Sequence, residues 1–169
     1  MDERDAINRL IDESTRRLSR DHYSDTQIDA AIANVFGVDT SLIEDGSYFV
    51  AESEGVLVAC GGWSRRKALF GSDEYSSSRD TGYLDPASDF AKIRAFFVHP
   101  DHARKGIARA ILARCEEEAR EHGFHGLELM ATLPGIEFYK SCGFTEAGEF
   151  DLNLPSGVKL EFVPMRKKL

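Results

Sequence analysis

The sequence predicts an α/β domain built on a mixed β-sheet. At the centre of the chain, two strand-like segments alternate with two helical patterns in the order β-α-β-α, and hairpin-like segments flank them. The chain has 169 residues, 42% of them apolar and 30% charged, which suffices for one domain with a substantial buried core. We therefore expect residues 1–169 to form a single domain.

Each element is predicted from the spacing of its apolar residues and from the turn residues that end it. Glu54-Gly55 supplies a hairpin turn, Gly61-Gly62 a bulge or a close contact, and Gly123 the end of the longest central helix. In chain order we predict helices within 1–20 and over 28–35, strands over 48–51, 56–60 and 93–98, a helix over 104–122, a strand over 127–131, a short helix over 134–141, and strands near 147–154 and 158–166.

Residues 66–90 form the least regular part of the chain. Gly71, Gly82, Pro86 and the serines at 76–78 interrupt every periodic pattern there. A loop of this length is unusual inside a compact domain. It is either a lid over a site or a surface excursion, and the sequence favours neither.

Composition argues against several classes of protein. The net charge is −8 and the basic residues are scattered, whereas a nucleic-acid-binding protein usually has a basic face. No apolar run approaches the roughly 18 residues of a membrane-spanning helix, and no signal-peptide core follows the acidic N-terminus, so we expect a cytoplasmic protein without a membrane partner. The three cysteines, Cys60, Cys115 and Cys142, do not form a CxxC motif, and we interpret them as small buried hydrophobic residues. We also expect no metal centre.

Residues 98–109 combine the end of a strand, a tight turn and the start of a helix. The first turn of a helix leaves backbone N–H groups unpaired and carries partial positive charge, so it can bind an anion. Gly106 and Ala108 would let phosphate oxygens approach the backbone closely. Further positive charge comes from Arg104, Lys105 and Arg109. The Walker A and GxGxxG patterns are absent, and these residues alone predict either an anion site or a well-capped core helix.

This segment resembles motif A of the GNAT superfamily of N-acetyltransferases, a loop of the pattern Gln/Arg-x-x-Gly-x-Gly/Ala. Gly106 and Ala108 match the last two anchors, and Ala103 stands at the first. The resemblance implies acetyl-CoA as the acyl donor, with its pantetheine arm on the main chain of the strand and its pyrophosphate in the loop. The implied cofactor-binding residues are Phe96, Phe97, Val98, Arg104, Lys105, Gly106, Ile107, Ala108 and Arg109.

Residues 135–144 are similar to motif B of the same superfamily, A-x-x-F-Y-x-x-x-G-F, with Tyr139 at the tyrosine position. The resemblance implies that Tyr139 hydrogen-bonds or protonates the CoA sulfur as it leaves, which a phenol with a pKa of about 10 can do. The alternative is a tyrosine packed only through its ring.

A protonated amine must lose a proton before it attacks. Glu128 is the candidate base, because it is a charged residue inside an apolar strand and some GNAT enzymes carry a glutamate base at the equivalent strand; it could instead face solvent or pair with a basic residue. His99 and His102 are weaker candidates, and Arg94 either binds substrate or forms a structural ion pair. A main-chain N–H near Val98 is the expected donor to the developing oxyanion.

The resemblance also implies the GNAT fold: a mixed, mostly antiparallel twisted sheet with helices on both faces and a V-shaped slot opened by a strand bulge. The first strand is short or missing here, because Met1 leads almost directly into a helical pattern. The exposed sheet edge could pair with a second copy of the chain. Sedimentation showing only monomer at micromolar concentration would count against such a homodimer.

The implied function is acetyl-CoA-dependent transfer of an acetyl group to a primary amine of a small molecule or peptide. We expect direct attack, because no cysteine occupies a convincing nucleophile position. The alternative is a GNAT fold that binds CoA as a sensor or scaffold without turnover. The residues expected near the acceptor, which do not identify it, are His22, Tyr23, Trp63 and the segments 66–90 and 155–157.

Overall fold

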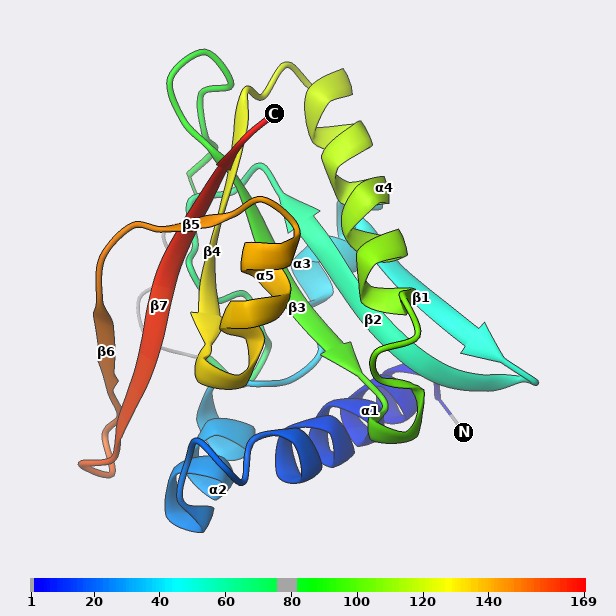
Figure 1. Cartoon of the computed structure of the whole chain (residues 1–169), viewed down its shortest axis with the longest axis vertical. Coiled ribbons are helices and arrows are strands. Elements are labelled where there is room, and N and C mark those ends of the chain that lie inside the picture. Colours follow the sequence, from blue (N-terminus) through cyan, green and yellow to red (C-terminus); the bar gives the residue numbers. More distant parts are fainter. Residues whose placement is uncertain (1, 76–81) are drawn as a thin grey trace.

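A seven-stranded sheet forms the centre of the computed structural model, which describes residues 2–75 and 82–169 (Figure 1). The strands follow the order β1-β2-β3-β4-β7-β5, and β6 also pairs with β7. Every pairing is antiparallel except that of β3 with β4, which confirms a mixed, mostly antiparallel sheet. The strands are β1 (Tyr48–Ser53), β2 (Val56–Ser64), β3 (Ala91–Val98), β4 (Gly126–Thr132), β5 (Thr145–Glu146), β6 (Phe150–Asn153) and β7 (Lys159–Lys168).

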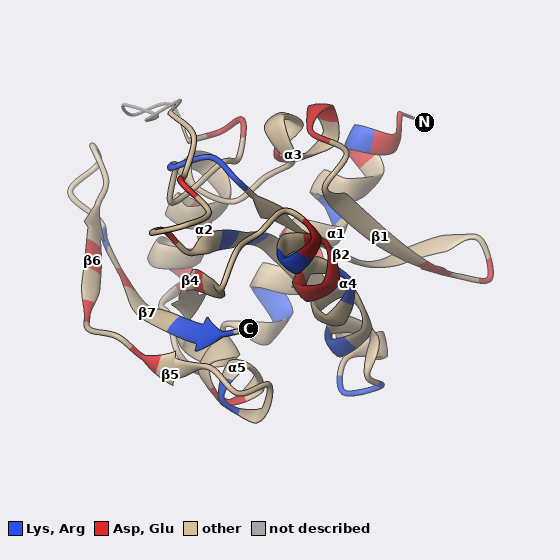
Figure 2. Ribbon diagram, turned by 90° about the horizontal axis from the view of Figure 1, so that it is seen from above, with Lys and Arg blue, Asp and Glu red and all other residues tan. Residues whose placement is uncertain are grey.

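Helices cover both faces of the sheet, as expected (Figure 2). On one face, α1 packs on β2 and β3 and α2 packs on β7. On the other face, α4 and α5 enclose the largest hydrophobic cluster together with β3 and β4. The helices are α1 (Glu3–Leu18), α2 (Asp25–Asn34), α3 (Thr40–Glu44), α4 (Ile107–Glu121) and α5 (Ile136–Ser141), with 3-10 turns at η1 (Pro100–His102) and η2 (Leu133–Gly135).

The two long helices are amphipathic, and their apolar stripes decide which face each one covers. In α1 the buried residues Ile7, Leu10 and Ile11 follow helical spacing and face the sheet. In α4 the stripe predicted from the sequence lies on the opposite face, where Ile111, Leu112, Cys115 and Ala119 are buried and Ile107 is partly buried. Since an isolated helix of this length is at best marginally stable in water, packing of the apolar stripe supplies most of the stability of each helix.

The β1–β2 hairpin forms as predicted. Glu54 and Gly55 have φ values of 52° and 77°, and positive φ at both central residues is what a two-residue turn between twisted antiparallel strands requires. Gly61 and Gly62 lie where the strands are crowded: a Cβ on Gly61 would come within 2.5 Å of the Phe96 ring. The expected bulge or close contact at these glycines is confirmed.

Apart from shifts of a few residues at several element ends, the structure differs from the sequence-based expectation in the following elements. The short helix α3 was not predicted, and the strand predicted near 147–154 is instead two short strands, β5 and β6. In addition, α4 begins at Ile107 rather than at residue 104. No strand precedes α1 within the described residues, so β1 is an edge strand of the sheet. None of the helices in the described ranges is both long and apolar enough to cross a bilayer.

Candidate functional site

The site lies where two neighbouring strands separate. The parallel strands β3 and β4 are paired only at Ala91 with Leu127 and at Lys92 with Glu128, although both continue further. Beyond these pairs β4 does not occupy the adjacent edge of β3. A cleft of about 850 Å³ opens here and is lined by residues of both strands and of the helices on both faces. The slot expected from the family resemblance is therefore present.

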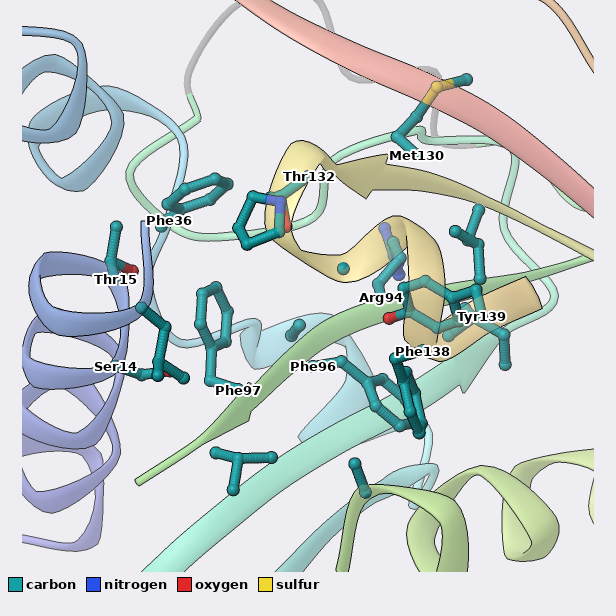
Figure 3. A pocket seen from close by; sticks show the side chains of 18 of the residues that line it. Ser14, Thr15, Phe36, Arg94, Phe96, Phe97, Met130, Thr132, Phe138 and Tyr139 are labelled. Atoms are coloured by element: carbon teal, nitrogen blue, oxygen red, sulfur yellow. The ribbon is translucent and has the colours of Figure 1, made fainter. Parts of the chain in front are cut away.

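A bulge in β3 sets the direction of the side chains along this slot. Against β2, Arg94 pairs with Gly62 and Phe97 with Cys60, so β3 carries one extra residue, and Ala95 has a positive φ of 57°. The bulge shifts the alternation of the strand. As a result Phe96 packs toward α4 and α5, whereas Phe97 lies on the side of α1 (Figure 3) and Arg94 is turned toward Asp39.

The loop that follows β3 forms one end of the cleft. Arg104 and Gly106 have φ values of 62° and 83°, and Gly106 is the N-cap of α4 without any side-chain cap. The first intrahelical bond runs from the Ala110 N–H to the Gly106 carbonyl, so the preceding amides of the first turn have no partner within the helix. Left-handed turns next to a helix start turn their N–H groups inward and create an anion-binding concavity.

The late start of α4 corrects the prediction that the helix begins at Arg104. Charged residues such as Arg104 and Lys105 fit a helical pattern, but the left-handed backbone at Arg104 and at Gly106 cannot belong to a right-handed helix. No heavy atom lies within 4 Å of a Cβ built on Gly106, so this glycine serves the backbone conformation and leaves the space above it open.

Most of the predicted cofactor-binding residues line the cleft. These are Phe96, Phe97, Val98, Arg104, Gly106, Ile107, Ala108 and Arg109. Lys105 is exposed and lies outside the lining. The Arg109 guanidinium donates to the Ser141 hydroxyl at 2.9 Å, so it bridges the first turn of α4 to the end of α5.

Tyr139 lies on the α5 side of the cleft. Its half-buried ring contacts Phe138, Phe144 and Phe96 at centroid distances of 5.0, 5.6 and 6.5 Å. In Figure 3 its hydroxyl points from α5 toward β3 and the interior of the cleft. Burial, with a smaller effect of Cys115 and Cys142, raises the pKa of Tyr139 above its usual value, so the phenol keeps its proton at neutral pH.

Glu128 immediately precedes Leu129, the first residue of β4 that lines the cleft, and it is not itself among the lining residues. Its carboxylate forms an ion pair with Lys92 and accepts a hydrogen bond from the Arg166 guanidinium at 2.9 Å. Of the alternatives considered for Glu128 from the sequence, pairing with basic residues is the one observed. Its role as a base stays a prediction.

Of the other polar candidates, some line the cleft and some are held by hydrogen bonds or ion pairs. His102 lines the cleft, whereas His99 accepts a hydrogen bond from the Asp101 N–H at 3.2 Å and lies 3.4 Å from Glu13. Arg94 lines the cleft but is buried, 3.4 Å from the buried carboxylate of Asp39. Of the two roles considered for Arg94, the structural ion pair is observed.

The end of the cleft beside α1 combines aromatic and aliphatic side chains with the hydroxyl groups of Ser14, Thr15, Ser19 and Ser72. Its walls come from α1, from residues 35–39, from the loop segment 69–72 and from β7. Residues 69–72 therefore form part of the wall. The choice between a lid and a surface excursion also concerns residues 76–81, which lie outside the described ranges. Besides Phe97, the apolar lining residues here are Leu18, Val35, Phe36, Leu69, Phe70, Met130 and Phe162.

Few of the residues expected near the acceptor reach this end. His22 lines it. Tyr23 is buried, and its hydroxyl donates to the Glu161 carbonyl at 2.6 Å. The Trp63 N–H donates to Glu118 at 2.9 Å within the core, and residues 155–157 are not among the lining residues. Leu69 and Phe70 belong to the segment 66–90 that was expected near the acceptor, and they line this end. Sequence reasoning missed Phe36, which no local pattern singles out.

The three cysteines are buried and free, which agrees with their interpretation as structural residues. Burial raises the pKa of the Cys60 thiol to about 12 and also raises that of Cys115, so both stay protonated and unreactive at neutral pH. Within residues 2–75 and 82–169, no group of three or more His, Cys, Asp and Glu side chains could hold a metal ion.

Solved structures that share this fold include N-acetyltransferases, among them structures with coenzyme A or acetyl-CoA bound. A GCN5-related N-acetyltransferase from Rhodopseudomonas palustris has 18% identity and a TM-score of 0.72, covering 99% of this chain and 90% of that one. The PaiA N-acetyltransferase from Thermoplasma acidophilum, in complex with coenzyme A, has 14% identity and a TM-score of 0.65, covering 99% and 93%. YncA from Salmonella typhimurium, with its cofactor acetyl-CoA, has 20% identity and a TM-score of 0.61, covering 99% and 88%.

At sequence identities this low, the similarity to these structures shows only that the fold is shared. No curated protein matches the chain. The model of the acetyltransferase (GNAT) family matches residues 5–144, which include the cleft loop and Tyr139. The chain therefore belongs to the GNAT family of acetyltransferases.

Proposed function

We propose that this chain transfers an acetyl group from acetyl-CoA to a primary amine of a small molecule or peptide, by direct attack within a complex of both substrates, and that residues 1–169 form one catalytic domain. One observation carries the proposal. A single cleft runs from the amide-rich loop at 104–109, past the Tyr139 hydroxyl, to an open end beside α1. Donor and acceptor could thus meet between the splayed strands.

The residues at the loop end fit the pyrophosphate of CoA. The amides of the first turn of α4 have no partner within the helix, and the space above Gly106 is open. Arg104 and Arg109 add positive charge at the same place. The slot between β3 and β4 is suited to the pantetheine arm, because the adjacent edge of β3 beyond Lys92 is not paired with β4.

Tyr139 supplies the proton in the transfer step. Acetyl-CoA provides an acetyl group activated as a thioester. As the amine nitrogen forms its bond to the acetyl carbon and the carbon–sulfur bond breaks, the Tyr139 hydroxyl donates a proton to the departing sulfur, and the proton that the new amide nitrogen loses restores the Tyr139 hydroxyl. A main-chain N–H near Val98 stabilises the negative charge that develops on the acetyl oxygen. Since its pKa is raised, Tyr139 is protonated and able to do this at neutral pH.

The amine loses its own proton before it attacks. Glu128 stays the predicted acceptor of that proton, and it would have to act through water, because Lys92 and Arg166 hold its carboxylate outside the cleft lining. Direct attack is supported by the cysteines, since burial keeps the thiols of Cys60 and Cys115 protonated.

The test is an assay of thiol release from acetyl-CoA with a panel of amines, together with calorimetric titration of acetyl-CoA. We expect micromolar binding and thiol release that depends on an amine. If acetyl-CoA binds but no amine causes thiol release, the alternative of a CoA-binding sensor or scaffold would be favoured. Absence of binding would contradict the assignment of the donor end.

A further inference from the structure

We propose that the amine acceptor is a small molecule in which a short linker joins the primary amine to an aromatic or bulky apolar body. This inference rests on the proposed function and concerns the end of the cleft beside α1. We call that region the acceptor end and define it by Leu18, Phe36, Leu69, Phe70, Phe97 and Phe162.

Four phenylalanines form a continuous aromatic wall there. Phe36 contacts Phe97 and Phe162 edge-to-face, with centroids 5.5 and 6.3 Å apart. Phe70 continues the row at 5.0 Å from Phe162. Phe36, Phe70 and Phe97 are only half-buried, so part of each side chain is accessible. A flat apolar group would bury that surface with the edge-to-face geometry that aromatic rings favour.

Two exposed leucines extend this surface to the mouth of the cleft. Leu18, at the end of α1, is 39% exposed, and Leu69, in the loop after β2, is 38% exposed. A single exposed leucine needs no explanation. Here two of them, from segments far apart in the sequence, line the same opening. An apolar entrance that leads to an aromatic wall is typical of a small-molecule pocket.

The charged groups at the acceptor end are paired with each other. Asp39 lies 3.4 Å from Arg94 and accepts a hydrogen bond from the Ser41 hydroxyl at 2.6 Å. The backbone of Gly71 packs over the pair, since a Cβ there would come within 2.0 Å of the Asp39 carboxylate and 2.2 Å of the guanidinium. Burying a second charge of the ligand here would require breaking that pair, which is costly.

The remaining carboxylate among the described lining residues is Glu137. It lies on α5, the opposite side of the cleft from α1, and is 3.7 Å from Lys140. Among the described residues, the acceptor end therefore offers no free carboxylate for the second ammonium of a polyamine, and apart from the paired Arg94 it offers no Lys or Arg side chain for the carboxylate of an amino acid. These charges argue for an acceptor whose only charged group is the amine that reacts.

The position of Phe97 limits the length of the linker. Phe97 follows the bulge at Ala95, and its ring lies on the α1 side of β3, directly next to the slot (Figure 3). An amine placed in the slot would therefore have its apolar body against Phe97 and Phe36 after only a few bonds. A peptide N-terminus would instead put a polar amide against these rings, which favours a small molecule.

The test compares matched amines with acetyl-CoA in the thiol-release assay: 2-phenylethylamine, ethylamine, spermidine and a hexapeptide with a free N-terminus. We expect kcat/KM for 2-phenylethylamine to exceed that for ethylamine by about 10- to 100-fold, the gain from burying one phenyl side chain. It should also exceed the values for spermidine and for the peptide. A preference for spermidine, the peptide or ethylamine would overturn this inference and leave the proposed function intact. If no amine, in this set or beyond it, supported thiol release, both this inference and the proposed function would be overturned.

Two variants locate the preference at the acceptor end. We expect Phe36→Leu to lower the ratio of kcat/KM for 2-phenylethylamine to that for ethylamine by about 10-fold, because it removes a ring while keeping most of the volume. The ratio does not depend on how much protein is folded, since partial unfolding lowers both rates equally.

Leu69→Ser should raise the KM for 2-phenylethylamine by about 3- to 10-fold without changing the KM for acetyl-CoA. Ile43→Ser is the matched control, because Ile43 is 45% exposed on α3 and does not line the cleft. It should change neither value. An unchanged ratio in Phe36→Leu together with an unchanged KM in Leu69→Ser would contradict the assignment.

Discussion

The two ends of the cleft are built in different ways. The donor end, at residues 104–109 and Tyr139, comes from two short segments and presents backbone amides of a helix start. The acceptor end presents side chains from α1, the segment after α2, the loop after β2, the bulged strand and β7. Backbone geometry recognises a constant group such as a pyrophosphate, whereas side chains define the shape of a variable one.

The comparison teaches where substitutions should act. A change at the donor end should alter binding or reaction of acetyl-CoA with any amine. A change at the acceptor end should alter only the choice among amines. A residue that merely supports the sheet between the two ends should change stability more than either property. The following predictions separate these three cases.

The largest effect is expected for Tyr139→Phe. Removing the hydroxyl takes away the proton donor to the sulfur, so kcat should fall by about 100-fold with every amine, while the Kd for acetyl-CoA stays within about 2-fold. Steady-state kinetics and calorimetry measure the two quantities. Because burial raises the pKa of Tyr139, its ionisation should cause no loss of rate in the wild type up to about pH 10. An unchanged kcat would remove Tyr139 from the mechanism.

A smaller effect is expected for Gly106→Val, compared with Gly157→Val. Both glycines have a φ of +83° and no atom within 4 Å of an added Cβ, so valine imposes similar backbone strain of about 1–2 kcal/mol at either position. Only Gly106 lies at the start of α4 in the cleft. We expect the Kd for acetyl-CoA to rise at least about 10-fold in Gly106→Val and to stay unchanged in Gly157→Val. Equal affinities in the two variants would contradict anion binding by this loop.

The smallest catalytic effect is expected for Glu128→Gln. This change breaks the ion pair with Lys92 and weakens the contact with Arg166, so it should lower the free energy of unfolding by about 1–3 kcal/mol. Because Glu128 would take the proton of the amine only through water, kcat should fall by about 5- to 20-fold at a temperature where the variant is folded. A kcat within about 2-fold of the wild type would show that Glu128 only supports the strands.

The donor end could be predicted from the sequence because its parts are contiguous in the chain. The turn after residue 98, Gly106 and Tyr139 stand in short motifs, and the alternation of strands and helices around them fixed the order of the central elements. The exact start of α4 could not be predicted, since it depends on left-handed backbone at Arg104, a residue whose type does not require it.

The acceptor end could not be predicted, because it exists only after folding. Phe36, Phe70, Phe97 and Phe162 come together through packing of segments that no local pattern connects. The partners of Glu128 depend in the same way on strand register: Lys92 is paired with it across β3 and β4, and Arg166 across β4 and β7. Spacing predicts that a charged residue in a strand needs a partner, and only the register identifies it.

The most direct measurement is a crystal structure of the chain with CoA. We predict that the pyrophosphate contacts the backbone amides of residues 104–109, that the pantetheine arm passes between β3 and β4, and that the sulfur lies within about 3.5 Å of the Tyr139 hydroxyl. CoA bound elsewhere, or with its sulfur directed away from Tyr139, would contradict the proposal that one cleft joins the donor to the acceptor.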